Sequence, residues 1–234
     1  MTSDTAIDID VVVDGIRLHC RVDGRPGSPP MVLLHALGED GSDWDDVVAE
    51  LDGDFQTYAV DLRGHGTSDW PGYYSFELMR DDVLGLLDQL GLDAVTLVGH
   101  SLGGLVAYLV AESQPARITR LVVADVCPPY PRERPIPERP DHPVPFDWPV
   151  VPAIATETGI ERAEWWDALA DITAPTLLVG GGPTSHVPQD LLAAVARRVP
   201  DCRLVTIEAG HHVHREAPES FMAALSDFLA DTTA

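Results

Sequence analysis

The stretch Ala94–Val110, AVTLVGHSLGGLVAYLV, decides the fold. Its first half is a short apolar run that predicts a buried strand over residues 94–99, and its second half predicts an apolar helix from Leu102 to Ser113. Between them, Gly99-His100-Ser101-Leu102-Gly103 has the pattern G-x-S-x-G. This pattern between a strand and a helix is typical of a sharp turn that lifts the serine above the sheet, beside the free N–H groups of the helix. Ser101 is therefore the candidate nucleophile.

Other short apolar runs, bounded by Gly, Pro or Asp, predict further buried strands at residues 31–35, 55–60, 118–125, 175–180 and 202–208. Apolar residues at helical spacing predict helices at residues 42–51, 75–90, 189–199 and 217–229. Near the N-terminus, residues 7–13 and 16–22 alternate around Asp14-Gly15, which predicts a hairpin at a sheet edge. The expected fold class is α/β: eight strands, mostly parallel, with helices on both faces.

Length and composition predict a single domain over residues 1–234. The chain is 45% apolar and 23% charged, which is globular composition. All 15 basic residues are arginine, so Schiff-base chemistry on a lysine and the P-loop lysine are excluded. The net charge of −23 makes nucleic acid and membrane surfaces poor partners, and a small-molecule substrate is the expected partner. The sequence leaves the oligomeric state open.

Cysteine usage and the N-terminus both bear on the compartment. Cys20, Cys127 and Cys202 are widely spaced, form no disulfide framework and favour a reducing compartment. The acidic N-terminus has no apolar region typical of a signal peptide, and no apolar run approaches the ~18 residues of a membrane span. We therefore expect a cytoplasmic location.

Residues 126–173 interrupt the alternation of strands and helices and predict an insertion that forms a short lid. Residues 128–152 contain ten of the chain's 20 prolines. Because proline fixes φ and removes a backbone donor, neither a long helix nor a central strand is expected there. One short helix is expected around residues 161–170. Aromatic residues favour an ordered lid over a disordered linker, and two of them, Phe146 and Trp148, are candidates for substrate contact.

Four motifs in a fixed order make nearly the whole chain resemble the α/β-hydrolase superfamily. The first in importance is the G-x-S-x-G motif around Ser101. Residues 35–38, HALG, are similar to the family's oxyanion loop, and residues 61–68, DLRGHGTS, are similar to its D-x-R-G-x-G-x-S loop. Residues 210–219, GHHVHREAPE, resemble the C-terminal segment with the catalytic histidine. The resemblance implies the α/β-hydrolase fold and implies neither a cofactor nor a metal.

The resemblance also assigns roles to individual residues. His211 matches the catalytic histidine, the general base that a serine nucleophile needs. The backbone N–H groups of Leu37 and Leu102 match the oxyanion hole, and His35 is a further candidate for substrate contact. A competing interpretation of the run HHVH at residues 211–214 is a metal site, although no Cys or carboxylate cluster pairs with it by spacing.

The catalytic acid departs from the commonest family pattern. The loop that usually carries it, here residues 178–188, LVGGGPTSHVP, holds no carboxylate. Asp125 ends the preceding strand, a position that resembles the relocated acid of some haloalkane dehalogenases and some lipases. We expect Asp125 to face His211. Three alternatives stay open: Asp190 as the acid, a serine–histidine dyad without an acid, and Asp125 as a turn cap.

A serine with a histidine base and an oxyanion hole suits acyl transfer through an acyl-enzyme intermediate. In the family that the chain resembles, haloalkane dehalogenases and epoxide hydrolases have an aspartate at the position of Ser101. The serine at this position therefore argues against both activities. The expected function is a serine hydrolase that cleaves an ester, thioester or lactone of a small apolar molecule. The alternatives are carbon–carbon bond hydrolysis or a lyase reaction on the same triad, and a ligand receptor that uses the hydrolase pocket without catalysis.

Overall fold

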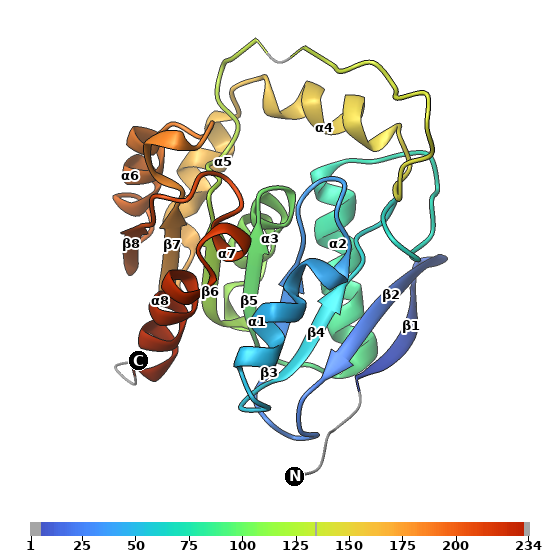
Figure 1. Ribbon diagram of the computed structural model, residues 1–234, viewed down its shortest axis with the longest axis vertical. Helices are drawn as coiled ribbons and strands as arrows, with labels where there is room; N and C mark the ends of the chain where they lie inside the picture. The colour runs from blue at the N-terminus through green and yellow to red at the C-terminus, as the bar shows by residue number, and fades with distance from the viewer. Residues whose placement is uncertain (1–5, 134, 232–234) are drawn as a thin grey trace.

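The computed structural model describes residues 6–133 and 135–231, and one eight-stranded sheet forms its centre (Figure 1). The order of the strands across the sheet is β1-β2-β4-β3-β5-β6-β7-β8. β2 is antiparallel to both of its neighbours, and all pairings from β4 to β8 are parallel. The predicted mostly parallel sheet is confirmed. The strand bounds are β1 (Ile7–Val13), β2 (Ile16–Asp23), β3 (Pro30–Leu34), β4 (Gln56–Val60), β5 (Val95–His100), β6 (Ile118–Ala124), β7 (Thr176–Gly180) and β8 (Cys202–Thr206).

The strands β1 and β2 form the predicted hairpin at the edge of the sheet. Their register pairs Val13 with Ile16, which leaves a two-residue turn. Asp14 and Gly15 have φ of 47° and 83°. A two-residue turn follows the twist of the strands when both of its central residues have positive φ. An Asp-Gly pair adopts this conformation readily.

Helices cover both faces of the sheet, as predicted. One apolar core lies between the sheet and α2, α3 and α6, and a second lies between the sheet and α1 and α8. Along β3, Val32 and Leu34 point into the first core, whereas Met31 and Leu33 point into the second. This alternation explains why a strand buried on both faces is apolar at every position. The helix bounds are α1 (Asp45–Glu50), α2 (Phe76–Leu90), α3 (Leu102–Ser113), α6 (Gln189–Ala196), α7 (Val213–Glu216) and α8 (Pro218–Ala230).

The connection from β6 to β7 passes over the top of the molecule in Figure 1 and contains two α-helices. The helix α5 (Ala163–Ala168) was expected; its Trp165 is buried against Phe76 of α2, with ring centroids 5.4 Å apart. The helix α4 (Val150–Thr158) was not expected, because Pro152 argued against it. Pro152 lies in the first turn, where a backbone N–H has no partner within the helix, so proline is tolerated there. The sequence analysis expected no long helix in this stretch and did not predict the nine-residue α4.

Across the residues described, no helix combines the length and the apolar character that a membrane crossing requires.

Candidate active site

Ser101 lies at the sharp turn between β5 and α3. Its φ of 51° and ψ of −110° are strained for a residue with a side chain. The neighbouring glycines make the turn possible, because a Cβ on Gly99 would lie 2.4 Å from the Gly103 carbonyl oxygen. A Cβ on Gly103 would lie 2.2 Å from the carbonyl oxygen of Leu34. The glycines of the G-x-S-x-G motif therefore allow close backbone packing, and the turn presents the serine hydroxyl at the edge of the sheet.

His211 follows Gly210, beyond the end of β8, and its ring lies between Ser101 and Asp125. The Oγ of Ser101 is 3.0 Å from Nε2 of His211, and Nδ1 of His211 is 2.8 Å from Oδ2 of Asp125. Both distances are those of good hydrogen bonds. A carboxylate only accepts, so Nδ1 carries the hydrogen and Nε2 is left to accept the serine proton.

Asp125 is fully buried directly after β6, in a strained backbone conformation with φ of 46°. Its Oδ1 accepts the N–H of Gly181 at 2.7 Å, and its Oδ2 accepts the hydroxyl of Ser185 at 2.5 Å in addition to His211. Among the described residues, Asp125 is the carboxylate that contacts the His211 ring; Asp190 lies in the first turn of α6. The structure therefore satisfies the distance that the relocated-acid hypothesis requires.

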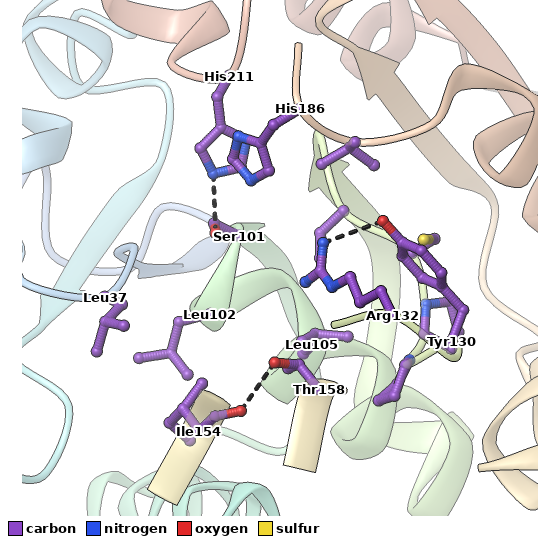
Figure 2. Close-up of a pocket in the computed structure, with 15 residues that line it drawn as sticks. Leu37, Ser101, Leu102, Leu105, Tyr130, Arg132, Ile154, Thr158, His186 and His211 are labelled. Carbon is purple, nitrogen blue, oxygen red and sulfur yellow. Dashed lines mark hydrogen bonds between the residues drawn. The ribbon is translucent and has the colours of Figure 1, made fainter. Parts of the chain in front are cut away.

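Leu37 and Leu102 both line the cavity that holds Ser101, and Figure 2 shows them near each other on the side of Ser101 away from His211. The N–H of Gly103 donates to the carbonyl of His35 at 3.0 Å, which ties the loop of Leu37 to the start of α3. Within residues 6–133 and 135–231, neither the N–H of Leu37 nor that of Leu102 has an acceptor. The role of these two groups as an oxyanion hole stays a prediction.

A cavity beside Ser101 contains about 480 Å³ of space that no atom fills, part of it open to solvent. Cys127 lines it, and burial raises the pKa of this thiol to about 12, so the thiol stays protonated and is a poor nucleophile. The other lining residues are mostly apolar or weakly polar (Figure 2): Leu37, Leu102, Leu105, Val126, Pro128, Pro129, Tyr130, Arg132, Ile154, Thr158, His186, Val187 and His211.

Three residues that were expected to contact substrate lie outside this cavity. His35 is fully buried; its Nε2 accepts the N–H of Leu62 at 3.0 Å and its Nδ1 donates to the carbonyl of Ala36 at 2.7 Å. Both ring nitrogens therefore form hydrogen bonds with backbone groups. Phe146 stacks on His65, and Trp148 lies against Phe146, with ring centroids 5.9 and 6.1 Å apart. None of the three side chains lines the cavity beside Ser101, so their contact with substrate stays a prediction.

Five residues that the sequence analysis did not single out line the cavity instead. Ile154 and Thr158 come from α4, and Tyr130 and Arg132 come from the proline-rich chain that precedes it. His186 lies against the ring of His211, with centroids 4.1 Å apart. No local pattern marks these positions: four of them reach the site through the long-range packing of the β6–β7 connection, and His186 reaches it from the loop after β7.

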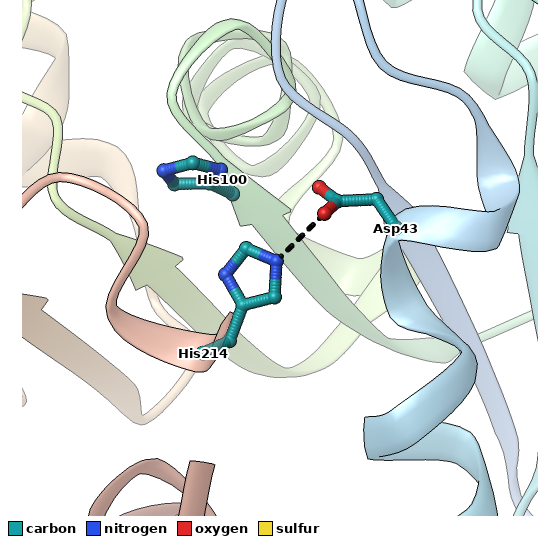
Figure 3. Close-up of side chains that lie close together, drawn as sticks. All are labelled: Asp43, His100 and His214. Atoms are coloured by element: carbon teal, nitrogen blue, oxygen red, sulfur yellow. Dashed lines mark hydrogen bonds and ion pairs between the residues drawn. The ribbon is translucent and has the colours of Figure 1, made fainter. Parts of the chain in front are cut away.

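A second histidine–carboxylate cluster lies behind the site: Asp43, His100 and His214, with candidate ligand atoms within 4.8 Å of one another (Figure 3). His214 Nε2 donates to Asp43 Oδ1 at 3.0 Å, and Arg215 Nε donates to the same oxygen at 2.5 Å. Burial opposes ionisation of Asp43, but His214 and Arg215 outweigh it and lower the pKa of Asp43 to about 2.

The cluster therefore contains an ion pair that anchors α7 beneath the site. His100 adds a second anchor, because its Nε2 donates to the carbonyl of His211 at 2.8 Å. Burial lowers the pKa of His100 well below its usual value, so this ring is neutral. Of the histidines in the run HHVH, His211 faces Ser101 whereas His214 faces Asp43, so the run does not converge on one point as the metal interpretation required.

The sequence profile of the alpha/beta hydrolase fold family matches residues 29–148, which include the oxyanion loop and the serine turn. The chain belongs to this family. Its order of motifs and its eight-stranded sheet agree with that assignment.

Relatives of different specificity match the chain. Mouse epoxide hydrolase 4 is 36% identical over 112 residues, which cover 47% of this chain and 31% of that protein. Mouse sn-1-specific diacylglycerol lipase ABHD11 is 29% identical, covering 89% of this chain and 83% of that protein. The enol-lactonase from Burkholderia xenovorans LB400 has the same fold, with a TM-score of 0.80 at 24% identity, covering 95% of this chain and 100% of that one.

Proposed function

We propose that the protein is a serine hydrolase that cleaves an ester, thioester or lactone of a small molecule through an acyl-enzyme intermediate. The observation that carries the proposal is the chain of hydrogen bonds from Ser101 through His211 to Asp125, at the edge of a mostly apolar cavity. This arrangement has the geometry of the serine–histidine–aspartate triad.

In the proposed mechanism, Ser101 Oγ attacks the substrate carbonyl carbon while its proton moves to Nε2 of His211. Asp125 stabilises the imidazolium that forms, and the N–H groups of Leu37 and Leu102 bind the developing oxyanion. His211 then gives the proton to the leaving oxygen or sulfur. A water molecule, deprotonated by His211, attacks the acyl-enzyme and releases the acid, which returns Ser101 to its starting state.

The β6–β7 connection acts as a lid in this proposal. Ile154 and Thr158 of α4 line the cavity that also holds Ser101, so the helix limits the length of the bound acyl group. The name of the diacylglycerol lipase relative agrees with ester hydrolysis. The epoxide hydrolase relatives favour another reaction, but the aspartate that such enzymes of this fold use at the elbow is a serine here.

Turnover of p-nitrophenyl esters of acetate to octanoate tests this function. We expect hydrolysis with a preference for the shorter chains, and Ser101→Ala should lower kcat/KM by a factor on the order of 10⁴ or more, because the members of a triad act as a unit. Ser226→Ala, at an exposed position on α8, is the matched control and should hydrolyse the esters like the wild type. Hydrolysis that survives in Ser101→Ala, or opening of styrene oxide by a wild type that leaves every ester intact, would contradict the proposal.

A further inference from the structure

The charge of the cavity differs from the charge of the protein. The chain has 38 acidic residues and a net charge of −23. Among the described residues that line the cavity beside Ser101, none is an aspartate or glutamate, and one, Arg132, is an arginine. Figure 2 shows its guanidinium between Ser101 and Tyr130. The protein is strongly acidic, but this cavity is lined by a guanidinium and by no carboxylate. Such a cavity is suited to an anionic ligand.

The guanidinium of Arg132 is held in place but not neutralised. Its Nη1 donates to the hydroxyl of Tyr130 at 3.0 Å, and its central carbon lies 4.8 Å from the centre of that ring. The backbone N–H of Arg132 donates to the carbonyl of Gly159, just after α4. In the described part of the chain, its Nε is buried without a hydrogen-bond partner, and no carboxylate forms an ion pair with it.

A buried donor of a charged group is costly to leave unpaired, and an arginine offers two parallel N–H groups that match a carboxylate. One guanidinium balances one negative charge, whereas a doubly charged phosphate would call for further cations. Resting on the function proposed above, we infer that the substrate carries a carboxylate in addition to its scissile carbonyl, and that Arg132 binds this carboxylate.

The inference predicts selectivity between esters that differ in one carboxylate. The first pair is p-nitrophenyl pentanoate and mono-p-nitrophenyl glutarate, and the second is p-nitrophenyl hexanoate and mono-p-nitrophenyl adipate. A third pair, butyl acetate and 4-acetoxybutyrate, places the carboxylate on the alcohol side. We measure kcat/KM for each, after subtracting uncatalysed hydrolysis. The wild type should prefer the carboxylate-bearing member of at least one pair by about 10-fold or more.

Substitution of Arg132 should change this ratio. Arg132→Gln should lower the preference on the order of 10- to 100-fold, and Arg132→Lys should retain part of it, because lysine keeps the charge but loses the planar fork. Arg198→Gln is the control, since Arg198 is exposed, lies over Trp166 and does not line the cavity beside Ser101; its ratio should equal that of the wild type.

The outcomes separate this inference from the proposed function. Hydrolysis of the neutral esters without any preference for a carboxylate overturns the role of Arg132 and leaves the serine mechanism standing. A preference that Arg132→Gln retains also overturns it, provided the variant melts like the wild type. If Arg132→Gln does not fold, the inference is tested by the ratio of kcat/KM values for the charged and neutral esters in the wild type and in Arg132→Lys. Absence of Ser101-dependent turnover with every ester overturns both proposals.

Discussion

Asp125 accepts three hydrogen bonds on one buried carboxylate, two from one loop and one from His211. The Gly181 N–H and the Ser185 hydroxyl both belong to the loop after β7, and the third donor is the ring of His211. Ser185 is itself fixed, because its oxygen accepts the N–H of Val187 at 3.0 Å. The loop that commonly supplies the acid in this family thus supplies donors that orient an acid on the neighbouring strand.

Replacement of Asp125 tests the orientation of His211. Asp125→Asn keeps the size of the side chain but removes its charge, so we expect kcat to fall by roughly 10²–10⁴, the range for loss of a triad orienter. Asp190→Asn is the control and should have nearly wild-type activity, since its side chain lies on α6. Ester turnover with purified variants of equal melting temperature measures this. Near wild-type activity in Asp125→Asn would show that a serine–histidine dyad suffices.

The proximity of Ser101, Asp125 and His211 could be predicted because each follows the end of a strand. Parallel strands place their carboxyl ends at one edge of the sheet, so Ser101 after β5 and Asp125 after β6 had to be neighbours. Side chains that reach the site from a long connection, such as Arg132, carry no such signal. His35 also stands at a strand end, but its ring turns inward to bind backbone, and the sequence does not reveal which way a single side chain turns.

At the scale of elements, prediction succeeded where capping residues and periodicity agree. Ser75 accepts the N–H of Leu78 at the start of α2, and Gly91 ends that helix with a φ of 65°. The helix α4 was not predicted because the ten prolines of residues 128–152 argue against a long helix there. Proline excludes only the helix interior, so a helix that begins two residues before Pro152 is compatible with the sequence.

The helix α3 contains a carboxyl group that makes stability depend on pH. Burial, and then the charge of Asp171, raise the pKa of Glu112 to about 8. The folded state therefore holds a proton that the unfolded state releases above its ordinary value of 4.5. Stability from this group is complete below that value and is lost as the pH rises toward about 8.

Glu112→Gln removes this dependence, so the variant should be more stable than the wild type at pH 8. We expect a difference on the order of 1–3 kcal/mol, or about 5 °C in Tm, that shrinks as the pH falls to 5. Glu138→Gln, at an exposed position, controls for the loss of one charge. Thermal melts at both pH values measure the effect. A Tm difference that is the same at pH 5 and pH 8 would contradict this account.

At the scale of the whole molecule, the fold brings together residues that are far apart in the chain. Ser101 and His211 are 110 positions apart, and they meet because β5 to β8 lie side by side with their ends at one edge. The hydrogen bond of Asp43 with His214 and its ion pair with Arg215 tie the C-terminal segment to η1 (Gly41–Trp44), in the N-terminal part of the chain. The triad geometry therefore depends on the complete sheet, and no local segment contains it.

Labelling with a fluorophosphonate tests the central claim most directly, because such a reagent reacts with a serine only where a base and an oxyanion hole activate it. After incubation, intact mass and peptide mapping should show one adduct per chain, on Ser101. Ser101→Ala should take up no label, and His211→Ala should label far more slowly, whereas the exposed-site control Ser226→Ala should label at the wild-type rate. An adduct on another residue, or a wild type that stays unmodified while it still hydrolyses esters, would contradict the account.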